Sequence, residues 1–76
     1  MTDYSNIFGS RVNELRKAKG LKQSELAEKL GTKKPSISQW ESGTSTPSFA
    51  MLCELADFFD VSLDYLVGRS DDPKAR

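Results

Sequence analysis

Apolar residues recur at helical spacing in this chain of 76 residues, within five short segments separated by glycine, proline and small polar residues. In the first segment Phe8, Val12 and Leu15 step by four and then three positions. This period of 3.6 residues predicts amphipathic helices, and no segment alternates as a half-buried strand does. We therefore expect an all-α protein with helices at about 6–19, 23–30, 34–42, 47–59 and 63–67.

The apolar stripes of the five segments also include Ala18, Leu21, Leu26, Ala27, Leu30, Ile37, Trp40, Phe49, Leu52, Leu55, Ala56, Phe59, Leu63, Leu66 and Val67. Within the fourth segment, Leu52, Leu55, Ala56 and Phe59 are expected to suffice for the core. Glycine residues are typical of helix C-termini, and they are expected to end the first three helices at Gly20, Gly31 and Gly43. For the fourth helix we predict Thr46 as the N-cap and Pro47 at the first helical position. Ser62 is the expected N-cap of the fifth.

Length and composition exclude several classes of protein. Seventy-six residues make one domain, and a chain of this size buries only about 60% of its unfolded surface. One cysteine and no histidine exclude an internal disulfide and the usual Cys/His zinc site. The N-terminus does not resemble a signal peptide, and no apolar run approaches the ~20 residues of a membrane span. We expect a cytoplasmic protein with no cofactor, no small-molecule ligand and no membrane contact.

The formal net charge of zero hides an asymmetry along the chain. Residues 1–48 hold eight basic and five acidic side chains, a net charge of +3, whereas residues 49–76 hold three and six, a net charge of −3. Because a polyanion responds to the local field, the neutral total does not exclude nucleic acid as a partner.

The two helices expected at 23–30 and 34–42, with a turn at "GTKK" between them, form a helix-turn-helix pattern spanning about residues 22–41. Ile37 and Trp40 face the first of these helices, which leaves the rest of the second helix pointing outward. That outward surface has no acidic residue from position 29 to position 40. It fits either a DNA-reading helix or an ordinary polar face, because serine, glutamine and lysine can bind bases and phosphates.

The segments "LKQSELAEKLGTKKPSISQWESGTSTPS" and "LADFFDVSLDYLVG" resemble the Cro/repressor-type helix-turn-helix domain of bacteria and phages, the XRE family. The resemblance covers about residues 8–68. It implies a compact five-helix, lambda-repressor-like DNA-binding domain at residues 6–68, a flexible N-terminus at 1–5 and a flexible tail at 69–76. It also implies that the second helix of the pattern enters the major groove.

The resemblance assigns candidate DNA contacts residue by residue. The positions that match base-reading residues are Lys34, Pro35, Ser38 and Gln39. Gln39 can bond adenine through two atoms and Lys34 can donate to guanine, but Pro35 offers no side-chain hydrogen bond and equally well only starts the helix. The candidate phosphate contacts are Lys22, Gln23, Lys33, Ser36, Ser42, Thr44 and Thr46. Lys22 stands where a capping hydroxyl is usual, so half of a capping box with Glu25 is missing.

Two further sets of residues have structural roles in this interpretation. Arg16 and Glu41 match an ion pair that ties the first helix to the end of the third in similar domains. Met51 and Phe58 lie seven positions apart and share a second apolar face of the fourth helix, which Tyr65 can join. We expect that face to form a homodimer interface, since a two-fold dimer doubles the base contacts on a palindrome.

We therefore expect a sequence-specific transcription regulator that binds double-stranded DNA. It is expected to act as a repressor and not as an enzyme. The sequence has no histidine, no phosphate-binding glycine loop and no nucleophile–base pair. Four contexts stay open: a phage immunity repressor, a plasmid or mobile-element regulator, a restriction–modification controller and an antitoxin. A larger repressor truncated after Arg76 stays open as well. The alternative from another class is a protein-interaction module on the same fold.

Overall fold

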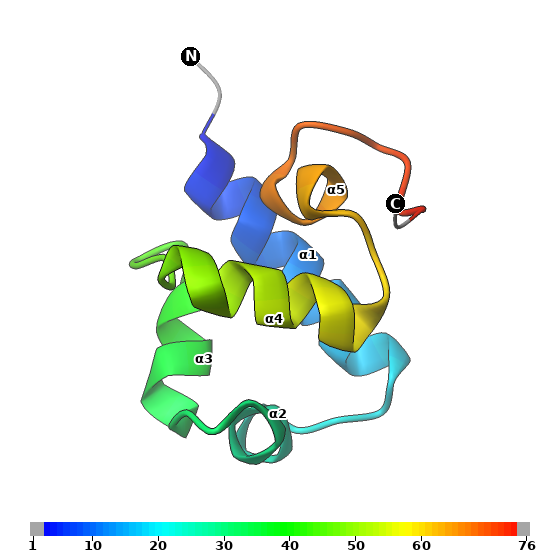
Figure 1. Ribbon diagram of the computed structural model, residues 1–76. Helices are drawn as coiled ribbons and strands as arrows, with labels where there is room; N and C mark the ends of the chain where they lie inside the picture. The colour runs from blue at the N-terminus through cyan, green and yellow to red at the C-terminus, as the bar shows by residue number, and fades with distance from the viewer. Residues whose placement is uncertain (1–2, 75–76) are drawn as a thin grey trace.

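The computed structural model describes residues 3–74, which form five α-helices (Figure 1). They are α1 (Tyr4–Ala18), α2 (Gln23–Leu30), α3 (Lys34–Ser42), α4 (Phe49–Phe59) and α5 (Leu63–Val67). The described residues contain no strand, so the all-α prediction is confirmed. The bounds of α2, α3 and α5 agree with those predicted, although Lys34 already belongs to α3 and the turn before it is one residue shorter than "GTKK".

The first helix begins two residues before its predicted start because Asp3 caps it. The Asp3 carboxylate accepts a hydrogen bond from the backbone N–H of Asn6 at 3.3 Å and another from the Asn6 side-chain amide at 2.8 Å. Residues 1–2 and 75–76 lie outside the described part of the chain, so the expected flexibility of the two ends stays a prediction there.

The predicted start of the fourth helix is wrong. Ser48, not Thr46, is the N-cap of α4, and its hydroxyl accepts a hydrogen bond from the backbone N–H of Met51 at 3.2 Å. Pro47 therefore precedes the helix. Thr46, Pro47 and Ser48 are adjacent in the sequence, and each residue type is typical of a helix N-terminus. The backbone N–H groups of Thr44 and Ser45 are hydrogen-bonded to the carbonyl oxygen of Gln39 at the end of α3, so α4 begins only after Ser48. Ser62 does cap α5, accepting from the N–H of Tyr65 at 3.0 Å.

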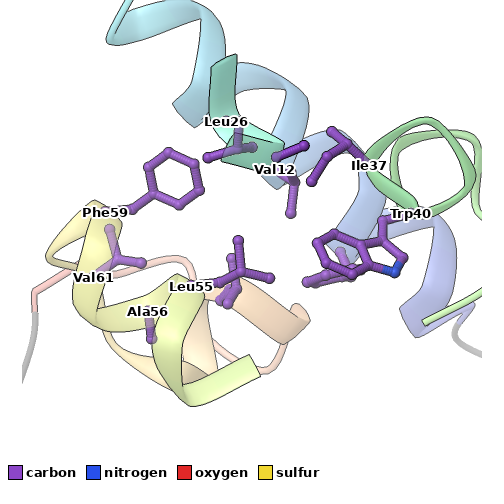
Figure 2. Close-up of a cluster of buried hydrophobic side chains, with 11 residues drawn as sticks. Val12, Leu26, Ile37, Trp40, Leu55, Ala56, Phe59 and Val61 are labelled. Carbon is purple, nitrogen blue, oxygen red and sulfur yellow. The ribbon is translucent and has the colours of Figure 1, made fainter. Parts of the chain in front are cut away.

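The helices pack around one core, with α1 in contact with α3 and α5, α2 with α3, and α4 with α5. In Figure 1 α4 crosses the front of the domain and α1 runs behind it. Figure 2 shows how side chains from different helices converge between them. The buried hydrophobic residues are Phe8, Val12, Leu26, Ala27, Ile37, Trp40, Leu55, Ala56, Phe59, Val61 and Leu66.

At three residues, burial differs from what the apolar stripes alone indicate. Phe49 is 73% exposed, because the cap at Ser48 places it in the first turn of α4 at the outer end of the helix. Ala18 is also exposed, at the last position of α1. Conversely Val61 is only 7% exposed, although it lies between α4 and α5 where no helical period could reveal it.

The polar segment after α5 is bonded to the domain through residue 73. The guanidinium of Arg11 donates from Nη1 to the carbonyl oxygen of Ser70 at 2.6 Å and lies 3.0 Å from a carboxylate oxygen of Asp71. The backbone N–H of Ser62 donates to the carbonyl oxygen of Pro73 at 3.0 Å. Within residues 3–74, no helix has the length and apolar content needed to cross a membrane.

Candidate nucleic-acid interface

The outward surface of α3 carries the predicted base-reading residues. Ile37 is fully buried and Trp40 is 6% exposed, so these two side chains hold the helix to the core. Exposed positions lie on the remaining surface, at Lys33, Lys34, Pro35, Ser38 and Gln39. Alternation of buried and exposed positions at helical spacing thus produces one face against the core and one open to a partner.

Within residues 3–74, no side-chain hydrogen bond caps the N-terminus of α3. Lys33 is the N-cap residue and makes no side-chain cap bond, and the first turn contains no acidic residue. Pro35 lies in that first turn, where a missing N–H costs no intrahelical hydrogen bond. An anion approaching this end would meet both the helix dipole and the lysine charges.

The N-terminus of α2 is arranged in a similar way. Lys22 is the N-cap residue and its side chain makes no cap bond, whereas the Glu25 carboxylate accepts from the Lys22 backbone N–H at 2.8 Å. Only the acidic half of the capping box is therefore present, since an ammonium group has no lone pair to accept a hydrogen bond. The Lys22 side chain is exposed beside a helix N-terminus.

The turn between the two helices fixes their relative placement. Gly31 ends α2 with φ of 71°, a conformation that strains other residues, and the N–H of Thr32 donates to the carbonyl oxygen of Ala27 at 2.9 Å. The helix-turn-helix geometry thus depends on one glycine and one short reversal of the chain.

A buried polar network lies directly behind α3 and joins it to α1 and α2. Arg16 Nε lies 2.6 Å from Glu41 Oε2, with side chains 11% and 7% exposed, so the expected ion pair is present. Glu41 Oε1 also accepts from Asn13 Nδ2 at 2.9 Å and from Gln23 Nε2 at 3.0 Å. Arg16 in turn donates to the carbonyl oxygen of Leu21 at 2.7 Å.

The sequence indicated the Arg16–Glu41 pair only through the family resemblance, and it gave no sign of the two amides. Gln23 was expected to bind phosphate, and in the structure one of its two amide hydrogens is bonded to Glu41. The second amide hydrogen stays available, so the Glu41 bond fixes the direction in which Gln23 can donate.

The environment of Glu41 decides its protonation. Burial by itself raises the pKa of this carboxyl group, but hydrogen bonds from Arg16, Asn13 and Gln23, together with the charge of Arg16, outweigh it and lower the pKa below its ordinary value. The group is therefore charged near neutral pH, and every member of the network has a partner.

The segment after α3 folds back onto the end of that helix. The Gln39 carbonyl oxygen accepts from the Ser42 hydroxyl at 3.1 Å and from the Thr44 N–H at 3.0 Å. The hydroxyls of Ser42 and Thr44 lie 2.8 Å apart. Because each hydroxyl has one hydrogen, Thr44 donates to Ser42 when Ser42 donates to Gln39. Either residue would have to give up one of these bonds to donate to a phosphate.

Two other expected phosphate contacts differ in accessibility. Thr46 is exposed in the same segment after α3, whereas Ser36 is half-buried in the first turn of that helix. The phosphate assignments of these residues stay predictions.

A close contact between α1 and α3, which nothing in the sequence indicated, supports the same helix. A Cβ placed on Gly9 would collide with the carbonyl oxygen of Trp40 and lie 2.8 Å from that of Glu41. Gly9 therefore lets the backbones of the two helices meet without an intervening layer of side chains.

The residues of the expected dimer face are half-buried and pack against the core. Phe58 meets Phe59 edge-on at 5.2 Å between ring centroids and has the Lys19 ammonium 5.3 Å above its own ring. Tyr65 has the Arg11 guanidinium 3.9 Å from its ring centroid. Met51 is the third member. Part of each side chain is thus already in contact with other residues of the same domain.

Across residues 3–74, no group of three or more His, Cys, Asp or Glu side chains is placed to hold a metal ion.

The five helices and the open face of α3 define a helix-turn-helix domain of the lambda-repressor-like fold. The chain belongs to the helix-turn-helix family whose model matches residues 12–66, which confirms the family resemblance. It is 40% identical over 67 residues to the uncharacterised transcriptional regulator YobD of Bacillus subtilis, covering 88% of this chain and 60% of that protein. This chain thus spans about 60% of the length of that curated relative.

Solved structures show the same fold. The P22 c2 repressor, in complex with a synthetic operator, superposes with a TM-score of 0.78 at 30% identity, over 84% of this chain and 97% of that one. The restriction–modification controller C.AhdI of Aeromonas hydrophila has a TM-score of 0.72 at 32% identity, over 87% of this chain and 99% of that one.

Proposed function

We propose that the chain is a DNA-binding transcription regulator of the repressor type, with α3 lying in the major groove of double-stranded DNA. The observation that carries the proposal is the exposed surface of α3, free of acidic side chains from residue 29 to residue 40 and backed by a satisfied polar network. The similarity to the P22 c2 repressor, whose structure was solved in complex with a synthetic operator, supports DNA as the partner.

The contacts divide into two kinds. Lys34, Ser38 and Gln39 project from α3 and can reach base edges, with Pro35 limited to apolar contact such as a thymine methyl group. Lys22, Gln23, Lys33 and the residues after α3 flank them and can bind phosphates, which orients the domain without specifying sequence. The net charge of −3 in residues 49–76 belongs to the other part of the chain, so the neutral total is no obstacle.

The regulator would act as a homodimer on an inverted repeat. One domain presents few base-reading side chains, and a two-fold dimer doubles them at half-sites about one DNA turn apart. The exposed remainders of Met51, Phe58 and Tyr65 are the proposed contact. We expect such a regulator to act in the cytoplasm, where the bacterial chromosome lies. It would control transcription without a cofactor and without catalysing a reaction itself.

Selection of bound sequences from a random duplex pool, at a stated salt concentration, tests the function. Recovery of a palindrome would support both DNA reading and the dimer. Recovery of a single half-site would support DNA reading by a monomer. Absence of any enrichment would reject the proposal and favour a protein-interaction module on this fold.

A further inference from the structure

Gln39 is held by the protein at its side chain as well as at its backbone. The Ser45 hydroxyl donates to the side-chain oxygen Oε1 of Gln39 at 3.3 Å, and the Ser45 N–H donates to the Gln39 carbonyl oxygen at 3.3 Å. One residue of the following loop thus binds two separate groups of a predicted base-reading residue.

The loop that carries Ser45 is itself fixed. The N–H of Gly43 donates to the carbonyl oxygen of Trp40 at 3.1 Å, and that of Thr44 donates to Gln39 at 3.0 Å. Gly43 has φ of 79°, and a Cβ at that position would collide with the side chain of Asn6. The Ser45 hydroxyl therefore approaches Gln39 from a loop that is hydrogen-bonded to the end of α3 and packed against α1.

Because the Ser45 hydroxyl donates to Oε1, the bond determines which atoms Gln39 offers outward. The oxygen and nitrogen of the planar amide diverge from one carbon atom, so an oxygen turned toward the loop leaves the two N–H donors of Nε2 directed away from it. Adenine in the major groove requires both an acceptor for its N6 amino group and a donor to N7. Guanine offers acceptors at O6 and N7, and thymine offers an acceptor at O4.

We propose that Ser45 is a positioning residue that sets Gln39 to present N–H donors, so that Gln39 selects the keto bases guanine or thymine over adenine. The proposal rests on the proposed function and refines it, because the adenine contact expected from the sequence assumed an unrestrained amide. Ser45 itself touches no base in this account and acts through Gln39.

The test compares base preference in Ser45→Ala, which loses the hydroxyl, and Ser45→Thr, which retains it. The base pair read by Gln39 is first located as the one at which Gln39→Ala loses preference, and affinities are then measured on duplexes that differ there. In Ser45→Ala the ratio of affinity for adenine to that for guanine or thymine should rise about tenfold, within the discrimination of a good two-bond contact. Ser45→Thr should keep the wild-type ratio.

Two further measurements separate the possible failures. In the Gln39→Ala background, Ser45→Ala should leave the ratio unchanged. In the free protein, the NMR order parameter of the Gln39 side-chain amide should fall in Ser45→Ala and stay high in Ser45→Thr, which tests the restraint without DNA. Weaker binding to all duplexes alike would make Ser45 a phosphate contact and overturn the proposal, as would an unchanged ratio. A wild-type protein that selects no sequence, with the amide still restrained, would reject the proposed function instead.

Discussion

Glu41 Oε1 accepts a hydrogen bond from Gln23 Nε2 at 3.0 Å, across the angle between the two helices of the helix-turn-helix. The same carboxylate is paired with Arg16 on α1. One buried charge therefore connects the stability of the domain with the orientation of a side chain that is predicted to meet DNA.

Removing this charge should destabilise the domain strongly. Glu41→Ala leaves the Arg16 guanidinium buried without its partner, a change that costs about 3–5 kcal/mol in comparable pairs. The midpoint of thermal unfolding should fall by ten degrees or more. Glu54→Ala, at an exposed position of α4, is the control and should change the midpoint little. An unaltered midpoint in Glu41→Ala would show that the pair contributes nothing.

Acid should weaken the domain through the same group. Because the pKa of Glu41 is lowered in the folded protein from its ordinary value of 4.5, the unfolded chain binds the proton more readily. The stabilisation is complete above that ordinary value and is lost as pH falls through the lowered folded pKa. Urea unfolding between pH 7 and pH 3 should show the difference between wild type and Glu41→Gln shrinking at low pH. A difference that stays constant would contradict the lowered pKa.

The two glutamines of the interface should differ in what their loss does to DNA binding. Gln39→Ala should cost about 1–3 kcal/mol on the preferred duplex and relax preference at one base pair. Gln23→Ala should weaken all duplexes alike, since a phosphate contact carries no sequence information. Titrations on the selected duplex and on single-base variants, at one salt concentration, make the comparison. Equal loss of preference in both variants would contradict the division between base and phosphate contacts.

Gly9→Ala should destabilise the protein although alanine is the better helix former. The added Cβ meets the backbone of α3 at Trp40 and Glu41, which can move only if the helix moves. The expected cost of about 1–3 kcal/mol exceeds the roughly 1 kcal/mol gained in helix propensity. Ser10→Ala, at the neighbouring exposed position, is the control and should be neutral or stabilising. A rise in the unfolding midpoint of Gly9→Ala would refute the close contact.

Phe49 and Leu55 on the same helix should differ in how much stability their truncation costs. Leu55 is fully buried, so Leu55→Ala should cost about 2–5 kcal/mol, whereas Phe49→Ala removes a ring that is 73% exposed and should cost far less. Chemical denaturation of both variants measures the difference. Comparable losses would contradict the exposed position of Phe49.

The sequence predicted what depends on local patterns. Helical spacing gave the bounds of α2, α3 and α5, and the division of α3 into the buried Ile37 and Trp40 and an exposed surface. It missed what depends on contacts between distant segments. Ser48 displaces Thr46 as a cap because the preceding loop is bonded back to α3. The bond from Gln23 to Glu41 joins positions eighteen residues apart, and no local period reports such a contact.

The backbone contact at Gly9 also limits how an operator preference can change in descendants of this domain. At this point no side-chain layer separates α1 from α3, so there is no core residue between them whose exchange would change the spacing of the two helices. A new base preference would then arise by exchange of the exposed side chains at the predicted base-reading positions 34, 35, 38 and 39, while the placement of α3 stays the same. Under the proposed positioning role of Ser45, an exchange at this loop residue would be a further way to change base preference while Gln39 is kept.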